Sequence, residues 1–199
     1  MFNLRIIILI LTIFVYKSSI AEVNEQKILK YLQNFNSLMS DFIQVNNSGD
    51  VLSGKISISR PGKVRVEYNE VPLLIISDGK KIASINKELK SITFYRIKDI
   101  PLALLLFKNF SLDNVQVLDF SDFENQLRIR LKEKNKNSEG FIDVLFEKNT
   151  FTLKKWIVFT NKVNKTEVLL ENIKLNVNIQ NKIFQIDESD PRHPIWRDY

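Results

Sequence analysis

The chain has 199 residues, with 29 basic and 23 acidic residues, no cysteine and a single histidine. This length suits one domain with a substantial core, and the missing thiols exclude disulfides, cysteine nucleophiles and cysteine-ligated zinc. The single histidine, His193, lies close to the C-terminus, and no glycine-rich phosphate loop occurs. Basic and acidic residues alternate without a basic stripe. We therefore expect no enzymatic activity, no cofactor, no metal site and no nucleic-acid binding.

Residues 1–21 are typical of a signal peptide. Arg5 precedes an apolar run over residues 6–15, and Ser19 and Ala21 supply the small side chains that a signal peptidase requires. The run is too short to span a bilayer comfortably. We expect cleavage after Ala21 and an envelope location, the alternative being an uncleaved N-terminal anchor. Residues 22–187 would then form the domain and residues 188–199 a flexible polar tail.

The first elements of the domain are a helix and several strands. Ile28, Leu32 and Phe35 recur at helical spacing, which predicts an amphipathic helix over residues 25–35. A strand over residues 39–45 follows. Next come strands separated by Pro61-Gly62 and Pro72, then a tight turn at Asp78-Gly79.

Alternation gives two of these strands one apolar face each. Arg60 shares a face with Ile56 and Ile58, so one cation ends a row of aliphatic side chains. On the next strand the apolar face is formed by Val64, Val66 and Tyr68. The pattern predicts a sheet with a greasy face and a single cation at its rim.

The second half of the chain begins with an apolar helix and continues in strands. The segment PLALLLFKNF, residues 101–110, opens on a proline that suits a first helical turn and is apolar nearly all round. Such a helix either is fully buried or covers something hydrophobic. The strands expected after it span residues 115–120, 126–133, 140–147, 152–160 and 166–175.

About ten strands in meander order, with one helix before them and one in the middle, predict a mainly β fold. We expect a strongly curved antiparallel sheet. It would be either a closed barrel or an open half-barrel with helices over its mouth.

Several motifs resemble those of the LolA family, the periplasmic carriers of outer-membrane lipoproteins. They are Phe42-x-Gln44, the block Gly54-x5-Arg60-Pro61-Gly62-Lys63-x-Arg65-x-Glu67-Tyr68, Pro72, Ser77-Asp78-Gly79-Lys80 and Pro101-Leu102. The resemblance implies an unclosed β-barrel whose hydrophobic interior lies under a helical lid. It also implies a periplasmic carrier, which we expect to be a monomer. Its partners would be acylated lipoproteins, an ABC-type inner-membrane transporter that releases them and an outer-membrane acceptor.

The resemblance also implies site residues. The functional arginine of the family falls on Arg60, where it would hold the lid closed by hydrogen bonds to lid backbone. An apolar family position, aromatic in some members, falls on Val64. We expect an acyl-chain cavity walled by Phe42, Ile56, Ile58, Val64, Val66, Tyr68, Phe94, Leu104, Leu105 and Phe107. The alternative functions are an envelope-stress sensor of the same fold, a lipoprotein acceptor, which would need a lipidated cysteine, and a lipid hydrolase.

Overall fold

The computed structural model describes residues 22–97, 100–108, 110–134, 140–161 and 163–186. The expected signal peptide and the expected C-terminal tail lie outside these residues. None of the helices in the described ranges is long and apolar enough to cross a bilayer.

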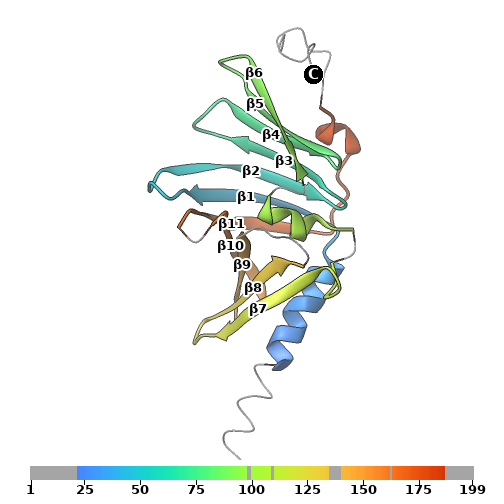
Figure 1. The fold of residues 1–199 in the computed structure, drawn as a ribbon, viewed down its shortest axis with the longest axis vertical. Coiled ribbons are helices and arrows are strands. Elements are labelled where there is room, and N and C mark those ends of the chain that lie inside the picture. Colours follow the sequence, from blue (N-terminus) through green and yellow to red (C-terminus); the bar gives the residue numbers. More distant parts are fainter. Residues whose placement is uncertain (1–21, 98–99, 109, 135–139, 162, 187–199) are drawn as a thin grey trace, which may run out of the picture.

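Within the described residues, the fold is one antiparallel sheet of eleven strands, in the order β6-β5-β4-β3-β2-β1-β11-β10-β9-β8-β7. Two meanders, β1 to β6 and β7 to β11, are joined where β1 pairs with β11. The sheet is strongly curved, and β6 and β7 end it on opposite sides, so the barrel is unclosed (Figure 1). This confirms the open form of the expected fold. The strands are β1 (Ser37–Val45), β2 (Val51–Ser59), β3 (Lys63–Tyr68), β4 (Leu73–Asp78), β5 (Lys81–Asn86), β6 (Ser91–Arg96), β7 (Val115–Asp122), β8 (Gln126–Glu133), β9 (Phe141–Glu147), β10 (Thr152–Phe159) and β11 (Lys165–Leu175).

An N-terminal helix, residues 22–34, packs against the inner face of β7, β8 and β9 (Figure 1). Ile28 and Leu32 are fully buried there, and the ring of Tyr31 meets Phe146 of β9 edge-on, with centroids 5.0 Å apart. The helix buries one stripe because its apolar residues recur every three or four positions. Its apolar face and the inward residues of these strands belong to the main hydrophobic core, which extends to β1, β2, β3, β10, β11 and residues 104–106.

Two short 3₁₀ helices complete the fold in the described part of the chain. The first, η2 (Pro101–Leu106), lies in the connection from β6 to β7, across the concave side of the sheet (Figure 1). We call η2 the lid. The second, η3 (Asn181–Phe184), follows β11 and is tied to β3 on the convex side, where Arg65 donates to the carbonyl of Ile183 at 3.0 Å.

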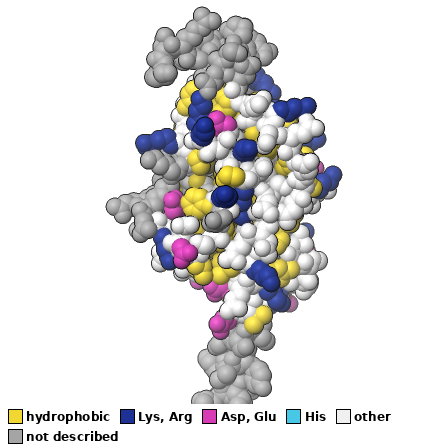
Figure 2. All heavy atoms as spheres, turned by 90° about the vertical axis from the view of Figure 1, so that its right-hand side faces the viewer, with side chains coloured by type: hydrophobic (Ala, Val, Ile, Leu, Met, Phe, Trp, Pro, Cys, Tyr) yellow, Lys and Arg dark blue, Asp and Glu magenta, His cyan; other side chains and the backbone are white. Residues whose placement is uncertain are grey.

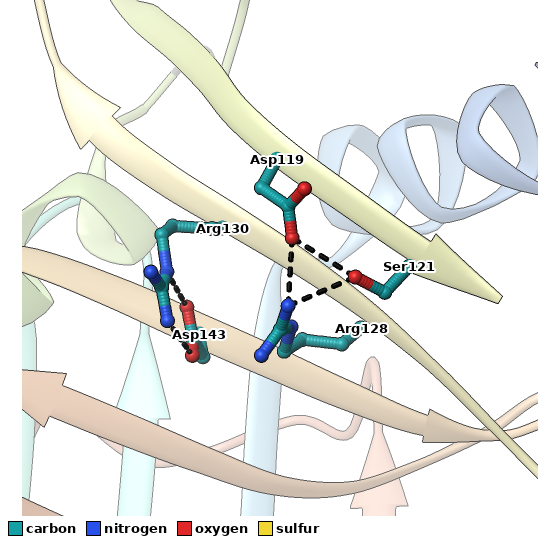
Figure 3. A network of polar contacts seen from close by, with 5 residues as sticks. All are labelled: Asp119, Ser121, Arg128, Arg130 and Asp143. Carbon is teal, nitrogen blue, oxygen red and sulfur yellow. Dashed lines mark hydrogen bonds and ion pairs between the residues drawn. The ribbon is translucent and has the colours of Figure 1, made fainter. Parts of the chain in front are cut away.

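Ion pairs cross the convex face of β7, β8 and β9 (Figure 3). Arg130 binds Asp143 through two hydrogen bonds, of 2.6 and 2.8 Å. Arg128 donates to Asp119 at 2.7 Å and to Ser121 at 2.8 Å. The alternation of β8 explains this arrangement, because its arginines lie on the face opposite its fully buried aliphatic residues.

Candidate functional site

A cavity of about 410 Å³ lies between the concave face of the sheet and the lid. Side chains from β1 to β6, β10 and β11 form its wall, together with residues at and just before the lid. None of the described residues that line it is charged. The lining residues are Phe42, Gln44, Ile56, Val64, Val66, Tyr68, Ile75, Ser77, Ile82, Ser84, Tyr95, Ile100, Leu102, Leu106, Trp156, Val158, Thr166 and Val168.

Strand register makes this wall continuous. Ile56 pairs with Val66, Val66 with Ile75, and Ile75 with Ser84, so one row of inward side chains crosses four strands. Directly paired residues in an antiparallel sheet point to the same face. Once Val66 is known to face inward, its partners on the next strands must do so as well.

A glycine in β2 makes room for the Phe42 ring of the wall. Gly54 pairs with Phe42 of β1 and with Tyr68 of β3. A Cβ atom on Gly54 would lie 2.9 Å from the Phe42 ring and 2.0 Å from the carbonyl oxygen of Glu67. The missing side chain lets the Phe42 ring fold over the strand and meet the Tyr68 ring edge-on, with centroids 5.4 Å apart.

The wall contains one internal hydrogen bond between neutral groups. The hydroxyl of Tyr68 donates to Oε1 of Gln44 over 3.0 Å. Burial raises the pKa of Tyr68, and the hydrogen bond to Gln44 only partly offsets this. The phenol therefore stays neutral across the physiological range.

Half of the residues expected in the cavity wall line it. Phe42, Ile56, Val64, Val66 and Tyr68 all do so. Ile58 shares the inward face of β2 but lies deeper, 1% exposed in the main core, and does not reach the cavity.

Phe94 was expected in the wall, but it faces the other side of the sheet. It pairs with Ala83, whose neighbours Ile82 and Ser84 line the cavity, so Ala83 and Phe94 point to the convex face. There the ammonium of Lys81 lies 4.9 Å from the centre of its ring. On β6 it is Tyr95 that lines the cavity. The reason is the two-residue period of a strand, in which a shift of one position reverses the face.

The lid presents different leucines from those expected. Leu104 and Leu105 are buried in the main core, whereas Leu102 and Leu106 line the cavity. Phe107 borders a separate depression of about 420 Å³, beside Pro61 and Gly79. A helix that is apolar all round carries no periodic signal, so its inward residues cannot be told from its sequence.

The cavity has further lining residues that sequence reasoning did not single out for the wall. On β4 and β5 they are Ile75, Ser77, Ile82 and Ser84, and pairing with the known face of β3 would have found them. On β10, Trp156 and Val158 line the cavity while Ile157 and Phe159 point outward. That strand is apolar on both faces, so alternation alone could not choose between them.

Arg60 follows β2 directly and extends beneath the lid. Its Nε donates to the carbonyl of Leu105 in the lid at 2.7 Å. One of its terminal nitrogens, Nη1, donates to the carbonyls of Leu32 and Phe35, each at 2.6 Å. The expected contact with lid backbone is therefore joined by two bonds to the end of the N-terminal helix, which the sequence did not predict.

The surroundings of Arg60 are mostly apolar. Its guanidinium lies 4.3 Å from the centre of the Phe35 ring and 6.0 Å from that of Phe110. Burial lowers the pKa of Arg60 to about 10, so it remains a cation at neutral pH. The last carbonyls of a helix lack partners within it and carry partial negative charge. The Arg60 cation, which donates to these carbonyls, is therefore stabilised electrostatically.

A second hydrogen bond fixes the lid to the sheet. The amide of Gly62, in the turn between β2 and β3, donates to the carbonyl of Leu106 at 2.9 Å. Gly62 has a φ of +71° and a Cβ atom there would lie 2.8 Å from the Cα of Gly79, so this turn requires glycine. The carbonyl of Gly62 accepts a 2.6 Å bond from the buried hydroxyl of Ser77.

The site offers a mainly apolar cavity and hydrogen bonds at its lid, and its described lining holds no charged side chain. In the described ranges no three His, Cys, Asp or Glu residues gather as metal ligands would. The side of the molecule shown in Figure 2 has hydrophobic side chains near its middle, with lysines and arginines spread around them.

A family model and a curated relative carry matching descriptions. The family model described as "Outer membrane lipoprotein carrier protein LolA" matches residues 33–187. A curated outer-membrane lipoprotein carrier protein of Dechloromonas aromatica is 29% identical over 156 residues, which span 73% of this chain and 74% of that protein.

Solved structures resemble the fold at low sequence identity. A LolA superfamily protein of Nitrosomonas europaea is 10% identical, with a TM-score of 0.45 over 81% of this chain and 97% of that one. An uncharacterized conserved protein of Thermus thermophilus is 9% identical, with a TM-score of 0.48 over 83% and 95% of the two chains.

Proposed function

Because the chain belongs to the LolA family of outer membrane lipoprotein carrier proteins, we propose that it carries lipoproteins by binding their acyl chains in the cavity beneath the lid. The uncharged, mainly apolar lining of that cavity is the observation that carries this proposal. Burying one methylene contributes about 0.8 kcal/mol, so a sixteen-carbon chain gains on the order of 10 kcal/mol. The cavity volume of about 410 Å³ lies within the range usual for ligand sites.

The route of the cargo follows from the family. The protein works in the periplasm as a monomer, receives acylated proteins from an ABC-type transporter of the inner membrane and delivers them to an acceptor in the outer membrane. Tight apolar binding solves the problem of carrying acyl chains through water. It creates the problem of releasing them.

Arg60 addresses release by acting as a latch for the lid. Its guanidinium donates hydrogen bonds to Leu105 of the lid and to Leu32 and Phe35 at the end of the N-terminal helix. Hydrogen bonds from a charged donor contribute roughly 1–3 kcal/mol, which biases the lid toward closure without fixing it. Acyl chains must displace the lid to enter fully. The closed state then regains these bonds when the cargo leaves.

The test is binding of an acylated peptide. Native mass spectrometry should show a one-to-one complex with a tripalmitoyl cysteinyl peptide and none with the same peptide lacking its acyl groups. Val66→Glu, which places a carboxylate in the cavity wall, should abolish the complex. The matched variant Gln116→Glu, on an exposed position of β7 outside the cavity, should retain it.

Material purified from the envelope separates the alternatives. Bound lipoprotein supports the carrier. A regulatory protein bound without lipid would instead favour a sensor, and release of free fatty acid from the peptide would favour a hydrolase.

A further inference from the structure

The cavity differs from many lipid-binding pockets in one chemical respect. Its described lining holds neutral polar groups, from Gln44, Tyr68, Ser77, Ser84, Tyr95 and Thr166, but no cation. A free fatty acid at neutral pH carries a carboxylate, and a buried carboxylate without a partner is costly. The wall therefore accommodates hydrocarbon but offers no counter-ion to an acid.

The basic side chains that neighbour lining residues in the sequence point away from the cavity. Arg65 lies on β3 between Val64 and Val66, so it faces the convex side, where it bonds Ile183. Lys165 precedes Thr166 and bonds Glu167 on that same side. Arg60 is not a lining residue. Its Nε and Nη1 donate to the carbonyls of the lid and helix, whereas Nη2 is buried without a partner among the described residues.

The Gln44–Tyr68 pair provides what a neutral acyl carbonyl needs. Because Tyr68 donates to Oε1 of Gln44, the side-chain amide nitrogen keeps two N–H donors that have no partner in the described part of the chain. Both residues line the cavity. An ester or amide carbonyl accepts such a bond without bringing a charge into the wall.

We propose that the cavity selects acyl groups whose carbonyl belongs to an ester or an amide, with Gln44 donating to that carbonyl, and that it rejects free fatty-acid anions. This inference rests on the proposed function and specifies its ligand class. Lipoprotein acyl chains are esters and amides, so the selectivity keeps the carrier from filling with free fatty acids.

The experiment compares two lipids of equal chain length. A pyrene-labelled monoacylglycerol serves as the bound probe, and myristate and 1-monomyristoylglycerol compete with it at pH 8, each below its aggregation concentration. Monomyristoylglycerol should displace half of the probe at a concentration at least tenfold lower than myristate does. At a pH low enough to protonate the acid, the difference should shrink.

Two variants locate the cause. Gln44→Leu should weaken monomyristoylglycerol binding three- to tenfold and leave the binding of tetradecane, which has no carbonyl, unchanged. Gln116→Leu is the control outside the cavity. Ser84→Lys places a cation on a half-buried lining position and should strengthen myristate binding at least tenfold.

The outcomes distinguish the two proposals. Equal displacement by both lipids overturns the selectivity while leaving acyl binding in place. If neither lipid displaces or binds, the carrier function itself is overturned, and the selectivity falls with it. If myristate binds the wild-type protein well and Arg60→Leu abolishes that binding, Arg60 is a counter-ion and the inference is wrong.

Discussion

Arg60 joins three separate parts of the chain through one side chain. It extends from the end of β2 to the lid and to the last turn of the N-terminal helix. Its position on the inward face follows from strand parity and was predictable. Its two helix contacts were not, because they depend on where a helix formed some thirty residues earlier comes to rest.

We predict that Arg60→Leu separates loading from delivery. The substitution removes the donors that hold the lid and adds apolar surface beside it, so the closed state loses roughly 1–3 kcal/mol. In an assay with inner-membrane vesicles and an acceptor, the variant should take lipoprotein from the vesicles and pass little onward. Arg60→Lys should be milder, since it keeps the charge but not the planar fork of donors. Delivery at the wild-type rate by Arg60→Leu would show that Arg60 is not a latch.

Asp143 gives a second prediction at this scale, concerning stability rather than function. Its side chain is 3% exposed and accepts two bonds from Arg130, whose side chain is 30% exposed. Asp143→Asn keeps the shape but leaves the guanidinium without its anion. Partial exposure of Arg130 moderates the cost, which should be about 1–3 kcal/mol in urea unfolding.

A weak ion pair in the same half of the sheet supplies the control. Lys154 and Glu147 lie 3.7 Å apart, with side chains 49% and 40% exposed. Lys154→Met should change the free energy of unfolding by less than about 0.5 kcal/mol. Equal effects of the two substitutions would mean that the Asp143 pair contributes no more than a surface contact.

At the scale of elements, the sequence predicted most strands to within one or two residues. Alternation was clear in β2, β3 and β8, where apolar and charged residues occupy opposite faces. It failed for β10 and the lid, where apolar residues occur on all sides and only packing decides which ones face the cavity. Phe94 was misplaced for another reason, since it shares the more apolar face of β6 with Ile92, and that face belongs to the convex side, where Ile92 packs with Ala83 in a second apolar cluster.

The N-terminal helix provides a pH-dependent prediction. Burial raises the pKa of Tyr31 to about 12 from an ordinary value near 10. Between these values the unfolded chain releases the phenolic proton before the folded one does. The contribution of the neutral Tyr31 phenol to the free energy of unfolding is therefore intact below pH 10 and is lost as the pH rises toward 12.

Tyr31→Phe tests this contribution without removing a ring. The variant should lose less stability than the wild type when urea unfolding is measured at pH 9 and again at pH 11. The difference should be up to about 1 kcal/mol, because partial exposure of the side chain reduces the full effect. Arg60, with its lowered pKa, acts in the opposite direction but equally in both proteins. Identical losses in the two proteins would contradict the prediction.

At the scale of the whole molecule, two parts of the sheet have different tasks. Strands β7 to β9 pack against the N-terminal helix, whose apolar residues belong to the main hydrophobic core. The remaining strands, β1 to β6 with β10 and β11, wall the cavity beneath the lid. A single curved sheet thus combines a filled core, which stabilises the protein, with an incompletely filled one, which can take a ligand.

This division predicts where the molecule changes on loading. The lid is held by the hydrogen bonds that Leu105 accepts from Arg60 and Leu106 accepts from Gly62. Entry of acyl chains must break them, and loss of the Arg60 bonds also frees the carbonyls of Leu32 and Phe35 at the helix end. Strands β8 and β9 take part in none of these contacts.

Hydrogen exchange with and without a tripalmitoyl cysteinyl peptide measures this pattern. Exchange should accelerate at the lid and in the last turn of the helix, while β8 and β9, which form none of these hydrogen bonds, should keep their protection. The peptide without acyl groups should change nothing. Arg60→Leu should show fast exchange at both places before any lipid is added, because its lid and helix end have already lost their shared donor. Deep and equal protection of the lid in the empty and loaded protein would mean that it is ordinary core, and that acyl chains enter by another route.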